Sequence, residues 1–518
     1  MCGITGILAF NEVGRFFSIK THGANTALAH RGPDAAKLFN DYYCALGHRR
    51  LSVIDTSSDA HQPMTDPAGR YTIVFNGEIY NYRELRQELQ QGDAGLQFHS
   101  QSDTEVLLQW YIRHKERGLA KLHGFFAFAI FDAEENSLFL ARDRFGIKPL
   151  LYYLDEDKFV FASELKALAA YNLPLQPDFT SMALYFQLHY VPAPYTIYQD
   201  TLKLLPGHYL KVQKNNMQLK QWYQPASMYT RQKPPETYEA AKKELLQLLE
   251  QAVAERMVSD VPLGAFLSGG IDSSTVVALA AGMTDKLRTF SVGFRNEPLF
   301  DETAYAQKVA EKYKTDHTVF NLSTDDYYDH LFDMLGFFGE PFADSSALPF
   351  YILSKKTRRE VTVALSGDGA DEVFAGYQKY NGEMKARRKG LAAQTVKQLL
   401  PVLERLPKSR NTFWGNKFRQ LHRFSTAARK EAADRYWYLS TWLPQEQNSQ
   451  LFTADTLARI DAEEYDHRRG QMLKWIDGQD FNSVLRSDVN TLLPNDMLHK
   501  VDSMSMAHGL EVRVPFLD

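Results

Sequence analysis

The stretch from Val261 to Gly282 constrains the fold of this 518-residue sequence more than any other. The apolar run Val261–Leu267 predicts a buried strand, and the run Ser273–Gly282 predicts a helix. Between them stands the short loop Ser268–Ser274, with the sequence SGGIDSS. Further predicted strands at 288–294 and 361–365 alternate with a predicted helix at 302–313. This alternation predicts an α/β domain built on a doubly wound parallel sheet.

The loop Ser268–Ser274 has the composition of a phosphate-binding turn. Gly269 and Gly270 let backbone N–H groups approach an anion closely, and the helix N-terminus adds partial positive charge. Asp272 would repel a phosphate unless it holds a Mg²⁺ ion that bridges to the phosphates. The Gly-x-x-x-x-Gly-Lys-Ser/Thr pattern of common kinases and GTPases does not occur in the sequence. A glycine turn with Asp and Ser capping a helix is the plainer interpretation, but strand, loop and helix together favour phosphate binding.

A second loop, SGDGADE at Ser366–Glu372, follows the strand predicted at 361–365. Doubly wound sheets bind ligands beyond the carboxyl ends of their strands, so both loops are expected there. Three carboxylates within five positions favour Mg²⁺. A solvated acidic turn is the alternative, and it is weaker because an apolar strand leads directly into the loop.

The sequence before about Gly207 lacks this regular rhythm. It carries β-type runs at 71–75, 125–131, 137–141 and 158–162, with helical spacing at 82–91 and 104–117. Such irregular alternation predicts a separate α+β domain.

Changes in composition indicate the domain boundaries. We predict a first domain over 1–208, a linker over 209–235 and a second domain over 236–518. The linker is polar and ends at Pro234-Pro235, after which Thr237 precedes a predicted helix over 239–257. This helix places Leu245, Leu248, Leu249 and Val253 on one face. From about 385 to 486 the sequence becomes charged and helical, which predicts a helical extension.

Composition excludes several classes of partner. The net charge of −4 gives no electrostatic reason to expect nucleic acid or an anionic membrane. The longest apolar run, 125–131, is far too short to span a bilayer. The N-terminus does not have the pattern of a signal peptide. Two cysteines, Cys2 and Cys44, are too few for a disulfide framework and fit a reducing compartment, so we expect a cytoplasmic protein.

Cys2 directly follows the initiator Met1. A residue this small permits trimming of the methionine, which would leave a thiol and a free α-amine on one residue. An α-amine with a pKa of about 7.7 to 8.0 can act as a base at neutral pH, and a nucleophile paired with such a base is activated. A cysteine placed here by accident is equally compatible with its position alone.

With Cys2 and both loops, the sequence resembles the glutamine-hydrolysing asparagine synthetases from Met1 to Asp518, most weakly between 385 and 486. The shared motifs in the first half are CGI at 2–4, HRGPD at 30–34, GHRRLS at 47–52, NGEIYN at 76–81, SDTE at 102–105 and RDRFGIKP at 142–149. The second half adds the two loops and EVRVPFLD at 511–518.

For the first half, the resemblance implies an N-terminal-nucleophile glutaminase with a four-layer αββα sandwich. The Cys2 thiolate would attack the side-chain amide of glutamine, while its own amine carries the proton. The other groups would be Asn76 and Gly77 as the oxyanion hole, Arg50 at the substrate α-carboxylate, and Glu78 and Asp103 at its α-ammonium.

For the second half, the resemblance implies an enzyme that splits ATP into AMP and pyrophosphate. Aspartate would be adenylated, and ammonia from Cys2 would travel internally to it, giving asparagine, glutamate, AMP and pyrophosphate. The nucleotide would contact Leu267, Ser268, Gly269, Gly270, Asp272, Ser273, Val292, Ser366 and Gly367. Asp272 and Asp371 would hold Mg²⁺, and Asp368 would lie near the acceptor.

Two features depart from the family pattern. Ser503 stands where members usually carry Arg or Lys, a base thought to neutralise pyrophosphate charge, and Lys500 lies one helical turn away. The family also normally continues beyond Asp518, so we expect a truncated synthetase domain.

Other functions remain open at this stage. The same chemistry could serve another carboxylate, such as a sugar acid or a peptide acid. A phosphoribosyl-pyrophosphate amidotransferase would share the first half, but the loop at 268–274 argues against it. A degenerate relative that only senses glutamine or nucleotide is the non-enzyme alternative, and a homodimer is open.

Overall fold

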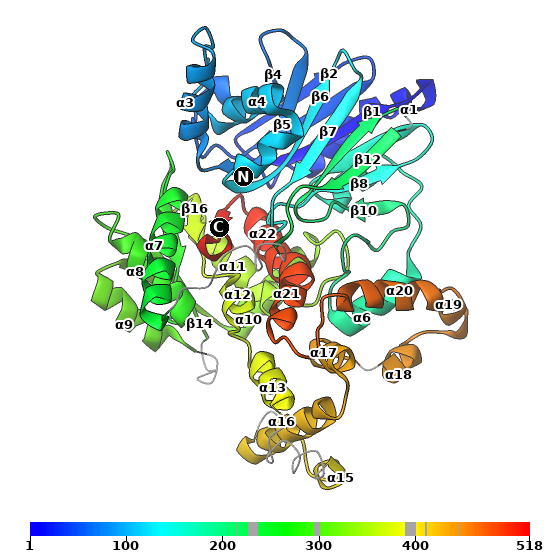
Figure 1. Ribbon diagram of the computed structural model, residues 1–518, viewed down its shortest axis with the longest axis vertical. Helices are drawn as coiled ribbons and strands as arrows, with labels where there is room; N and C mark the ends of the chain where they lie inside the picture. Colours follow the sequence, from blue (N-terminus) through cyan, green and yellow to red (C-terminus); the bar gives the residue numbers. More distant parts are fainter. Residues whose placement is uncertain (215, 226–236, 295–300, 389–399, 410–411, 444) are drawn as a thin grey trace. The chain divides into compact units, whose positions relative to one another are not determined.

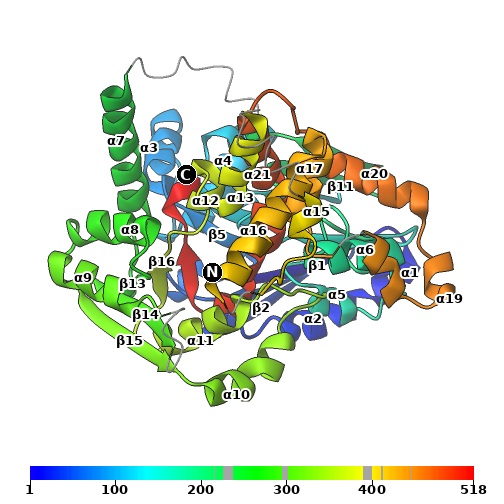
Figure 2. The same ribbon diagram turned by 90° about the horizontal axis from the view of Figure 1, so that it is seen from below.

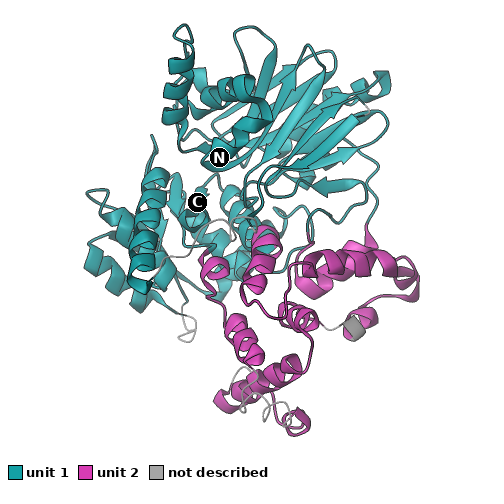
Figure 3. Cartoon of the chain, viewed as in Figure 1, with its two compact units in different colours: residues 1–177, 193–369, 496–518 teal, residues 178–192, 370–495 magenta. Residues whose placement is uncertain are grey.

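The computed structural model describes the whole chain except residues 215, 226–236, 295–300, 389–399, 410–411 and 444. The chain divides into two compact units (Figure 3). Unit 1 comprises residues 1–177, 193–369 and 496–518, and unit 2 comprises residues 178–192 and 370–495. In the described part of the chain, no helix is long and apolar enough to cross a membrane.

Two antiparallel sheets form the first half of unit 1 (Figure 1). The first has the strand order β10-β8-β9-β1-β3-β2, with bounds Thr201–Lys203, Leu151–Leu154, Lys158–Ala162, Gly3–Ala9, Cys44–Arg50 and Ala35–Asn40. The second has the order β12-β11-β7-β6-β5-β4, with bounds Asn216–Gln221, His208–Gln213, Ser137–Arg142, Gly124–Asp132, Tyr71–Ile79 and Met64–Thr65. The strands β1 and β5 are buried along their entire lengths.

The two sheets pack face to face through one hydrophobic core. Ile4, Leu46 and Phe161 enter it from the first sheet, and Val74 and Leu140 enter it from the second. Helices α2 (Thr21–Ala27) and α5 (Leu165–Ala169) contact the first sheet, while α4 (Asp103–His114) contacts the second and carries α3 (Tyr82–Gly92) beside it. The four-layer αββα sandwich is therefore confirmed.

The second sheet extends into the predicted linker. Strand β11 pairs with β7, and β12 pairs with β11, so residues 208–213 and 216–221 belong to the sandwich. Every residue of β12 is exposed, which explains why its polar composition resembled a linker. Residues 226–235 of the predicted linker lie outside the described residues.

A five-stranded parallel sheet forms the second half of unit 1, in the order β15-β14-β13-β16-β17. Its strands are Asp316–Leu322, Arg288–Phe294, Leu263–Phe266, Val363–Leu365 and Glu511–Arg513. The chain moves outward from β13 to β15 and then returns to the other side of β13 for β16. The predicted doubly wound sheet is confirmed, and its topological switch point lies between β13 and β16.

Helices cover both faces of this sheet (Figure 2). Ala265 and Leu365 face the core shared with α7 (Tyr238–Arg256), α8 (Ile271–Ala281) and α9 (Thr303–Tyr313). The alternate residues Phe266 and Ala364 face the core shared with α11 (Ala347–Thr357) and α22 (Leu498–Met506). Helix α10 (Thr324–Leu335) packs on α11.

Unit 2 is the predicted helical extension, joined by one helix from the first half of the chain. Its described α-helices are α6 (Phe179–Leu188), α12 (Ala370–Phe374), α13 (Gln378–Arg387), α15 (Leu400–Leu403), α16 (Phe413–Ala428), α17 (Ala432–Ser440), α18 (Gln445–Asn448), α19 (Ala454–Ala458), α20 (Ala462–Leu473) and α21 (Asn482–Asn490). Buried ion pairs link them: Arg435 binds Glu383 at 2.7 Å, and Arg468 binds Asp178 at 2.6 Å.

Candidate active sites

Cys2 is buried and lies immediately before the first residue of β1. Its backbone N–H donates to Asn76 Oδ1 at 2.9 Å, and its thiol lies 4.0 Å from the carbonyl oxygen of Leu51. Burial raises the pKa of the Cys2 thiol, while the charge of the neighbouring N-terminal ammonium acts against that rise. A thiol in this setting needs a base beside it to become a nucleophile.

Two candidate oxyanion donors stand on β5 beside this thiol. The Oδ1 atom of Asn76 accepts a hydrogen bond from the Cys2 N–H. Its buried Nδ2 makes no hydrogen bond to any residue that the structure describes. A buried amide donor without a partner is costly, so it is suited to a ligand oxygen. A Cβ on Gly77 would come within 2.1 Å of the carbonyl oxygen of Phe125, so only glycine fits there.

Arg50 ends β3 and turns its guanidinium into the loop that follows. It donates to the carbonyl oxygens of Ser57 at 2.7 Å and Ile54 at 3.3 Å, and also to that of Asp55. These bonds fix the orientation of a planar fork with five N–H donors. Donors that the loop does not use are available to a carboxylate.

Two buried carboxylates complete the first site. Burial raises the pKa of Glu78 well above its usual range, and the charges of Glu511 and Asp103 raise it further. Burial also raises the pKa of Asp103 to about 6, although the Ile79 N–H donates to this carboxylate at 2.9 Å. Glu78 Oε2 is buried and has no hydrogen-bond partner among the described side chains and backbone groups. Acids held this way are suited to a cationic group such as an α-ammonium.

The structure adds residues to this site that the sequence interpretation left without a role. The Met1 ammonium lies 2.8 Å from Glu511 Oε2, and Glu511 Oε1 accepts from Arg513 Nε at 2.6 Å. Arg31 donates to the Cys2 carbonyl at 3.0 Å and pairs with Asp502 at 2.8 Å. The motifs around Arg31, Glu511 and Arg513 were the only signal in the sequence.

The loop Ser268–Ser274 forms the N-terminus of α8, as predicted. Gly270 is the N-cap, and no described side chain caps the helix. The loop is closed by hydrogen bonds of Ser273 Oγ with the Ser268 N–H at 3.2 Å and with Ser268 Oγ at 3.0 Å. Gly269 has φ +82°, and a Cβ there would come within 2.5 Å of the Ala306 nitrogen. Uncapped N–H groups at an open helix N-terminus favour an anion.

The second loop touches the first across the switch point. A Cβ on Gly367 would lie 2.9 Å from the Ser273 nitrogen and 3.1 Å from Asp272 Cβ, so the two loops are in direct contact there. The Ser366 N–H donates to the Arg513 carbonyl at 2.8 Å, and its hydroxyl donates to Asp368. Ser366, Gly367 and Asp368 are thus brought together with Asp272 and Ser273.

The predicted magnesium ligands lie in different units. Burial raises the pKa of the half-buried Asp272 carboxyl, which forms no ion pair within the described ranges. Such a carboxylate fits a metal ion held jointly with phosphates. Asp371 lies on α12 in unit 2. Across the described part of the chain, no group of three or more His, Cys, Asp or Glu side chains forms a metal site by itself.

Two of the predicted nucleotide contacts, Leu267 and Val292, lie on neighbouring strands of the parallel sheet, Leu267 directly after β13 and Val292 within β14. The Leu267 N–H donates to the Phe290 carbonyl at 2.8 Å, and its carbonyl accepts from the Ser291 hydroxyl. Strand β13 ends at Phe266, whereas β14 continues to Phe294. The backbone of Val292 therefore lies beyond the end of β13. Its peptide groups on that side are not paired with β13 and could bind the adenine ring.

Ser503 lies on α22, one turn after Lys500. The Lys500 ammonium lies 3.3 Å from Asp344 and donates to Ser346 Oγ at 2.9 Å. Burial favours the neutral amine, but the carboxylates of Asp344, Asp368 and Asp496 outweigh it and raise the pKa of Lys500. A buried positive charge therefore faces the Asp368 loop although Ser503 carries none.

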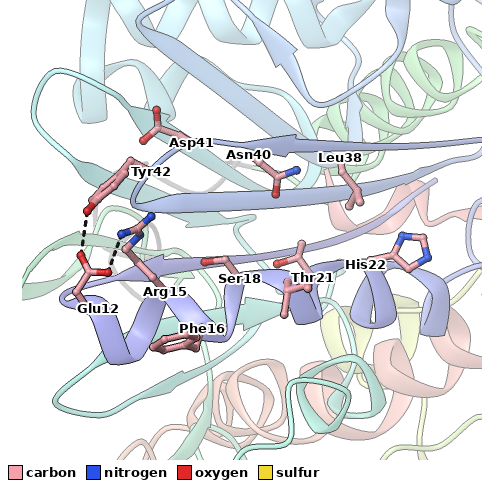
Figure 4. Close-up of a pocket in the computed structure, with 11 residues that line it drawn as sticks. Glu12, Arg15, Phe16, Ser18, Thr21, His22, Leu38, Asn40, Asp41 and Tyr42 are labelled. Atoms are coloured by element: carbon pink, nitrogen blue, oxygen red, sulfur yellow. Dashed lines mark hydrogen bonds and ion pairs between the residues drawn. The ribbon is translucent and has the colours of Figure 1, made fainter.

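A separate surface pocket of about 450 Å³ contains none of these residues (Figure 4). It lies between α1 (Glu12–Phe16) and β2, and Glu12 accepts from Arg15 at 2.7 Å and from Tyr42 at 2.9 Å at one end. Its lining does not overlap the two candidate active sites.

Comparisons with known proteins agree with this arrangement. A family described as a glutamine amidotransferase domain matches residues 1–223, and the asparagine synthase family matches residues 244–518. Glutamine-hydrolyzing asparagine synthetase 1 of Bacillus subtilis is 34% identical over 536 residues, covering 100% of this chain and 79% of that protein.

Two further relatives carry similar names. A putative glutamine-hydrolyzing asparagine synthetase 2 of Methanocaldococcus jannaschii is 38% identical over 73% of this chain and 76% of its own length. One from Mycobacterium bovis is 32% identical over 96% and 76%. A solved phosphoribosylpyrophosphate amidotransferase of B. subtilis, at 17% identity and a TM-score of 0.32 over 61% of this chain and 65% of that chain, is too distant to support a conclusion. The chain therefore belongs to the glutamine-hydrolysing asparagine synthetase family.

Proposed function

We propose that this chain makes asparagine from aspartate, with glutamine as nitrogen donor and ATP as energy source. One observation carries the proposal. A buried thiol beside a partnerless amide donor and two raised-pKa carboxylates shares unit 1 with an open phosphate loop at a topological switch point. The first group of residues suits amide hydrolysis, and the second suits nucleotide chemistry.

In the glutaminase site, removal of Met1 would free the Cys2 amine to take the thiol proton. The thiolate then attacks the glutamine amide, and Asn76 Nδ2 with the Gly77 N–H would bind the oxyanion. Arg50 would bind the α-carboxylate, and Glu78 and Asp103 would bind the α-ammonium. Ammonia leaves with the proton that the amine carried, and water hydrolyses the thioester to glutamate.

In the synthetase site, the aspartate β-carboxylate would attack the α-phosphate of ATP and release pyrophosphate. The nucleotide contacts would come from Leu267, Ser268, Gly269, Gly270, Asp272, Ser273, Val292, Ser366 and Gly367. Asp368 would lie near the acceptor. Asp272 and Asp371 would hold Mg²⁺, which neutralises phosphate charge when bound. Ammonia would then displace AMP from the acyl-adenylate.

The domain division is proposed with a later first boundary than the sequence indicated. The sandwich ends with β12 at Gln221, and α7 opens the second domain at Tyr238. We therefore place the glutaminase domain at 1–223 and the synthetase domain at 236–518, with residues 370–495 of unit 2 as the helical part of the latter.

Purified protein supplied with glutamine, ATP, Mg²⁺ and aspartate tests the proposed reaction. Asparagine, glutamate, AMP and pyrophosphate should all form. Formation of asparagine, AMP and pyrophosphate should require aspartate, whereas formation of glutamate should not. Glutamate without asparagine would remove the aspartate assignment, and sugar or peptide acids would then be tried. If no ATP-dependent pyrophosphate is released with glutamine or with ammonia, the sensor alternative would be left.

The homodimer is also a proposal, which we place at the pocket beside β2. Phe16 and Ile19 are 78% and 80% exposed there, and β2 is the last described strand of its sheet. Apolar side chains beside a strand edge are typical of association surfaces. Light scattering should give twice the chain mass, and Phe16→Glu with Ile19→Glu should halve it. A dimer unaffected by both changes would contradict this placement.

A further inference from the structure

Met1 occupies an internal position between the two halves of unit 1. The residue is 1% exposed, and both its ends contact charged groups. Its ammonium lies 2.8 Å from Glu511 on β17, in the synthetase half, and its sulfur contacts the Lys148 ammonium, which pairs with Asp502 on α22 at 2.9 Å. The space filled by Met1 thus runs from Cys2 to two elements of the synthetase half.

Removal of Met1, a step that rests on the proposed function, would empty this space and expose the groups around it to a ligand. Trimming removes the ammonium group that Glu511 binds, while Arg513 stays on the other carboxylate oxygen at 2.6 Å. Burial disfavours the charged form, but the Met1 ammonium and Arg513 together hold the pKa of Glu511 down to about 2. Losing one of these two cations leaves a buried carboxylate oxygen that needs a new partner.

A second buried oxygen faces the same deficit. Glu78 Oε2 lacks a hydrogen-bond partner among the described residues. After burial, the charge of Glu511 contributes most to the raised pKa of Glu78. Two other cations beside the space already have carboxylate partners, whereas Arg513 Nη2 is buried without a hydrogen bond to any described residue. Lys148 and Arg31 both pair with Asp502, and Arg31 also pairs with Glu164 at 2.9 Å. Because Glu78 is assigned to the α-ammonium of glutamine, the oxygen that loses its partner on trimming is Glu511 Oε2, and a small cation with several N–H donors would satisfy it.

We propose that Glu511 binds an ammonium ion at the position of the Met1 ammonium, as the first station for nitrogen leaving Cys2. The chain's own terminal ammonium is the stand-in for that ion in the structure. Glutamine hydrolysis itself supplies the proton, because the carboxylic acid and ammonia that it forms become glutamate carboxylate and ammonium. Before attack on the adenylated acceptor, the ion transfers this proton to solvent water, which leaves neutral ammonia and hydronium.

Rubidium is a suitable probe, because it resembles ammonium in charge and size and scatters anomalously. Cys2→Ala keeps a small second residue, so Met1 is trimmed, whereas Cys2→Leu retains Met1. Crystals of the trimmed variant in a rubidium salt should show an anomalous peak at Glu511 Oε2. Crystals of the untrimmed variant should show none, because the Met1 ammonium fills the position. Mass spectrometry verifies each N-terminus.

Substitution of the carboxylate supplies the matched comparison. Glu511→Gln in the Cys2→Ala background should abolish the rubidium peak, whereas Glu239→Gln, at a surface carboxylate that is 77% exposed, should leave it. If Glu511→Gln does not fold, Glu511→Asp is the second variant. It keeps the negative charge on a side chain one methylene shorter, so the rubidium occupancy should fall. A trimmed chain without a rubidium peak, or a peak that survives Glu511→Gln, overturns the proposal.

These crystals need no active thiol, so they separate this inference from the proposed function. In the chain with Cys2 intact, Glu511→Gln should raise the ratio of glutamate to asparagine by about tenfold, because a charged partner of the nitrogen is lost. An unchanged ratio of glutamate to asparagine would contradict a role of Glu511 in nitrogen transfer, even if rubidium binds there. A wild-type chain that releases no glutamate would instead refute the proposed function.

Discussion

At the scale of single residues, Asn76 divides its amide between two tasks. Its oxygen accepts from the Cys2 N–H, and its nitrogen is buried without a partner in the described part of the chain. The oxygen therefore positions the nucleophile, while the nitrogen remains for the developing oxyanion. Alanine would supply neither group, and aspartate would supply only the acceptor.

The change Asn76→Asp keeps the accepting oxygen and replaces only the donor. Glutaminase kcat should fall about 100- to 1,000-fold, because one oxyanion donor is lost and a negative charge replaces it. The KM for glutamine and ammonia-dependent synthesis should change little, as steady-state kinetics would record. Asn40→Asp at an exposed position is the control. An Asn76→Asp enzyme with normal kcat would refute the assigned donor.

Asp103 gives the first site a pH dependence of defined sign. Its pKa is raised to about 6, chiefly by burial, so the folded chain binds this proton more tightly than the unfolded chain. Its contribution to stability is present at low pH and is lost as the pH rises through about 6. Glutamine binding needs the opposite, ionised form.

The KM for glutamine should therefore fall by up to about tenfold per pH unit as the pH rises towards the pKa of Asp103. Over the same range, the free energy of unfolding of the wild type should decline relative to that of Asp103→Asn. Kinetics and denaturant titrations at matched pH measure the two effects. A stability difference that grows with pH in favour of the wild type would contradict the raised pKa.

Lys500 carries the positive charge that Ser503 cannot supply. Lys500→Met should lower ATP-dependent pyrophosphate release about 100-fold, because Asp344 and Asp368 would then repel the phosphates without compensation. Glutaminase activity should persist and would report that the chain is folded. Lys286→Met, at a side chain that is 69% exposed, is the control. Full pyrophosphate release by Lys500→Met would assign the charge to another residue.

At the scale of elements, the contact between the two synthetase loops depends on Gly367. Gly367→Ala would place a Cβ 2.9 Å from the Ser273 nitrogen, so the loops must separate. Pyrophosphate release should fall about tenfold or more, while glutaminase activity stays normal. Gly23→Ala, where nothing lies within 4 Å of the new Cβ, is the matched control. An unaffected Gly367→Ala enzyme would mean that the loops do not need this contact.

Elements with a strong pattern were predictable, and those without one were not. The strands at 158–162 and 288–294 and the loop that opens α8 follow from their local sequences. Strand β12 was missed because its residues are all exposed. On α7, Leu245 and Leu248 share the predicted apolar face but are 39% and 58% exposed, whereas Val253 is buried. Periodicity predicts an apolar face, but does not say what covers it.

At the scale of the whole molecule, residues from the two ends of the sequence meet inside unit 1. Met1 and Glu511 are 510 positions apart, and Arg31 reaches Asp502 across 471 positions. The sequence leads to proposed roles for Cys2, Arg50 and Asp103, because the motifs indicate the chemistry of a single site. The cluster that joins the two sites could not be predicted, because no local pattern indicates which distant charges will pair.

We propose that nitrogen passes inside this chain from Cys2 to adenylated aspartate. Glutamine labelled with ¹⁵N in its amide, supplied with aspartate, ATP, Mg²⁺ and excess unlabelled ammonium, tests it most directly. Mass spectrometry should find the label in asparagine far above its share of the total ammonia, because the nitrogen does not mix with solvent. Asparagine labelled only to the level of the mixed pool, or no asparagine at all, would contradict the account.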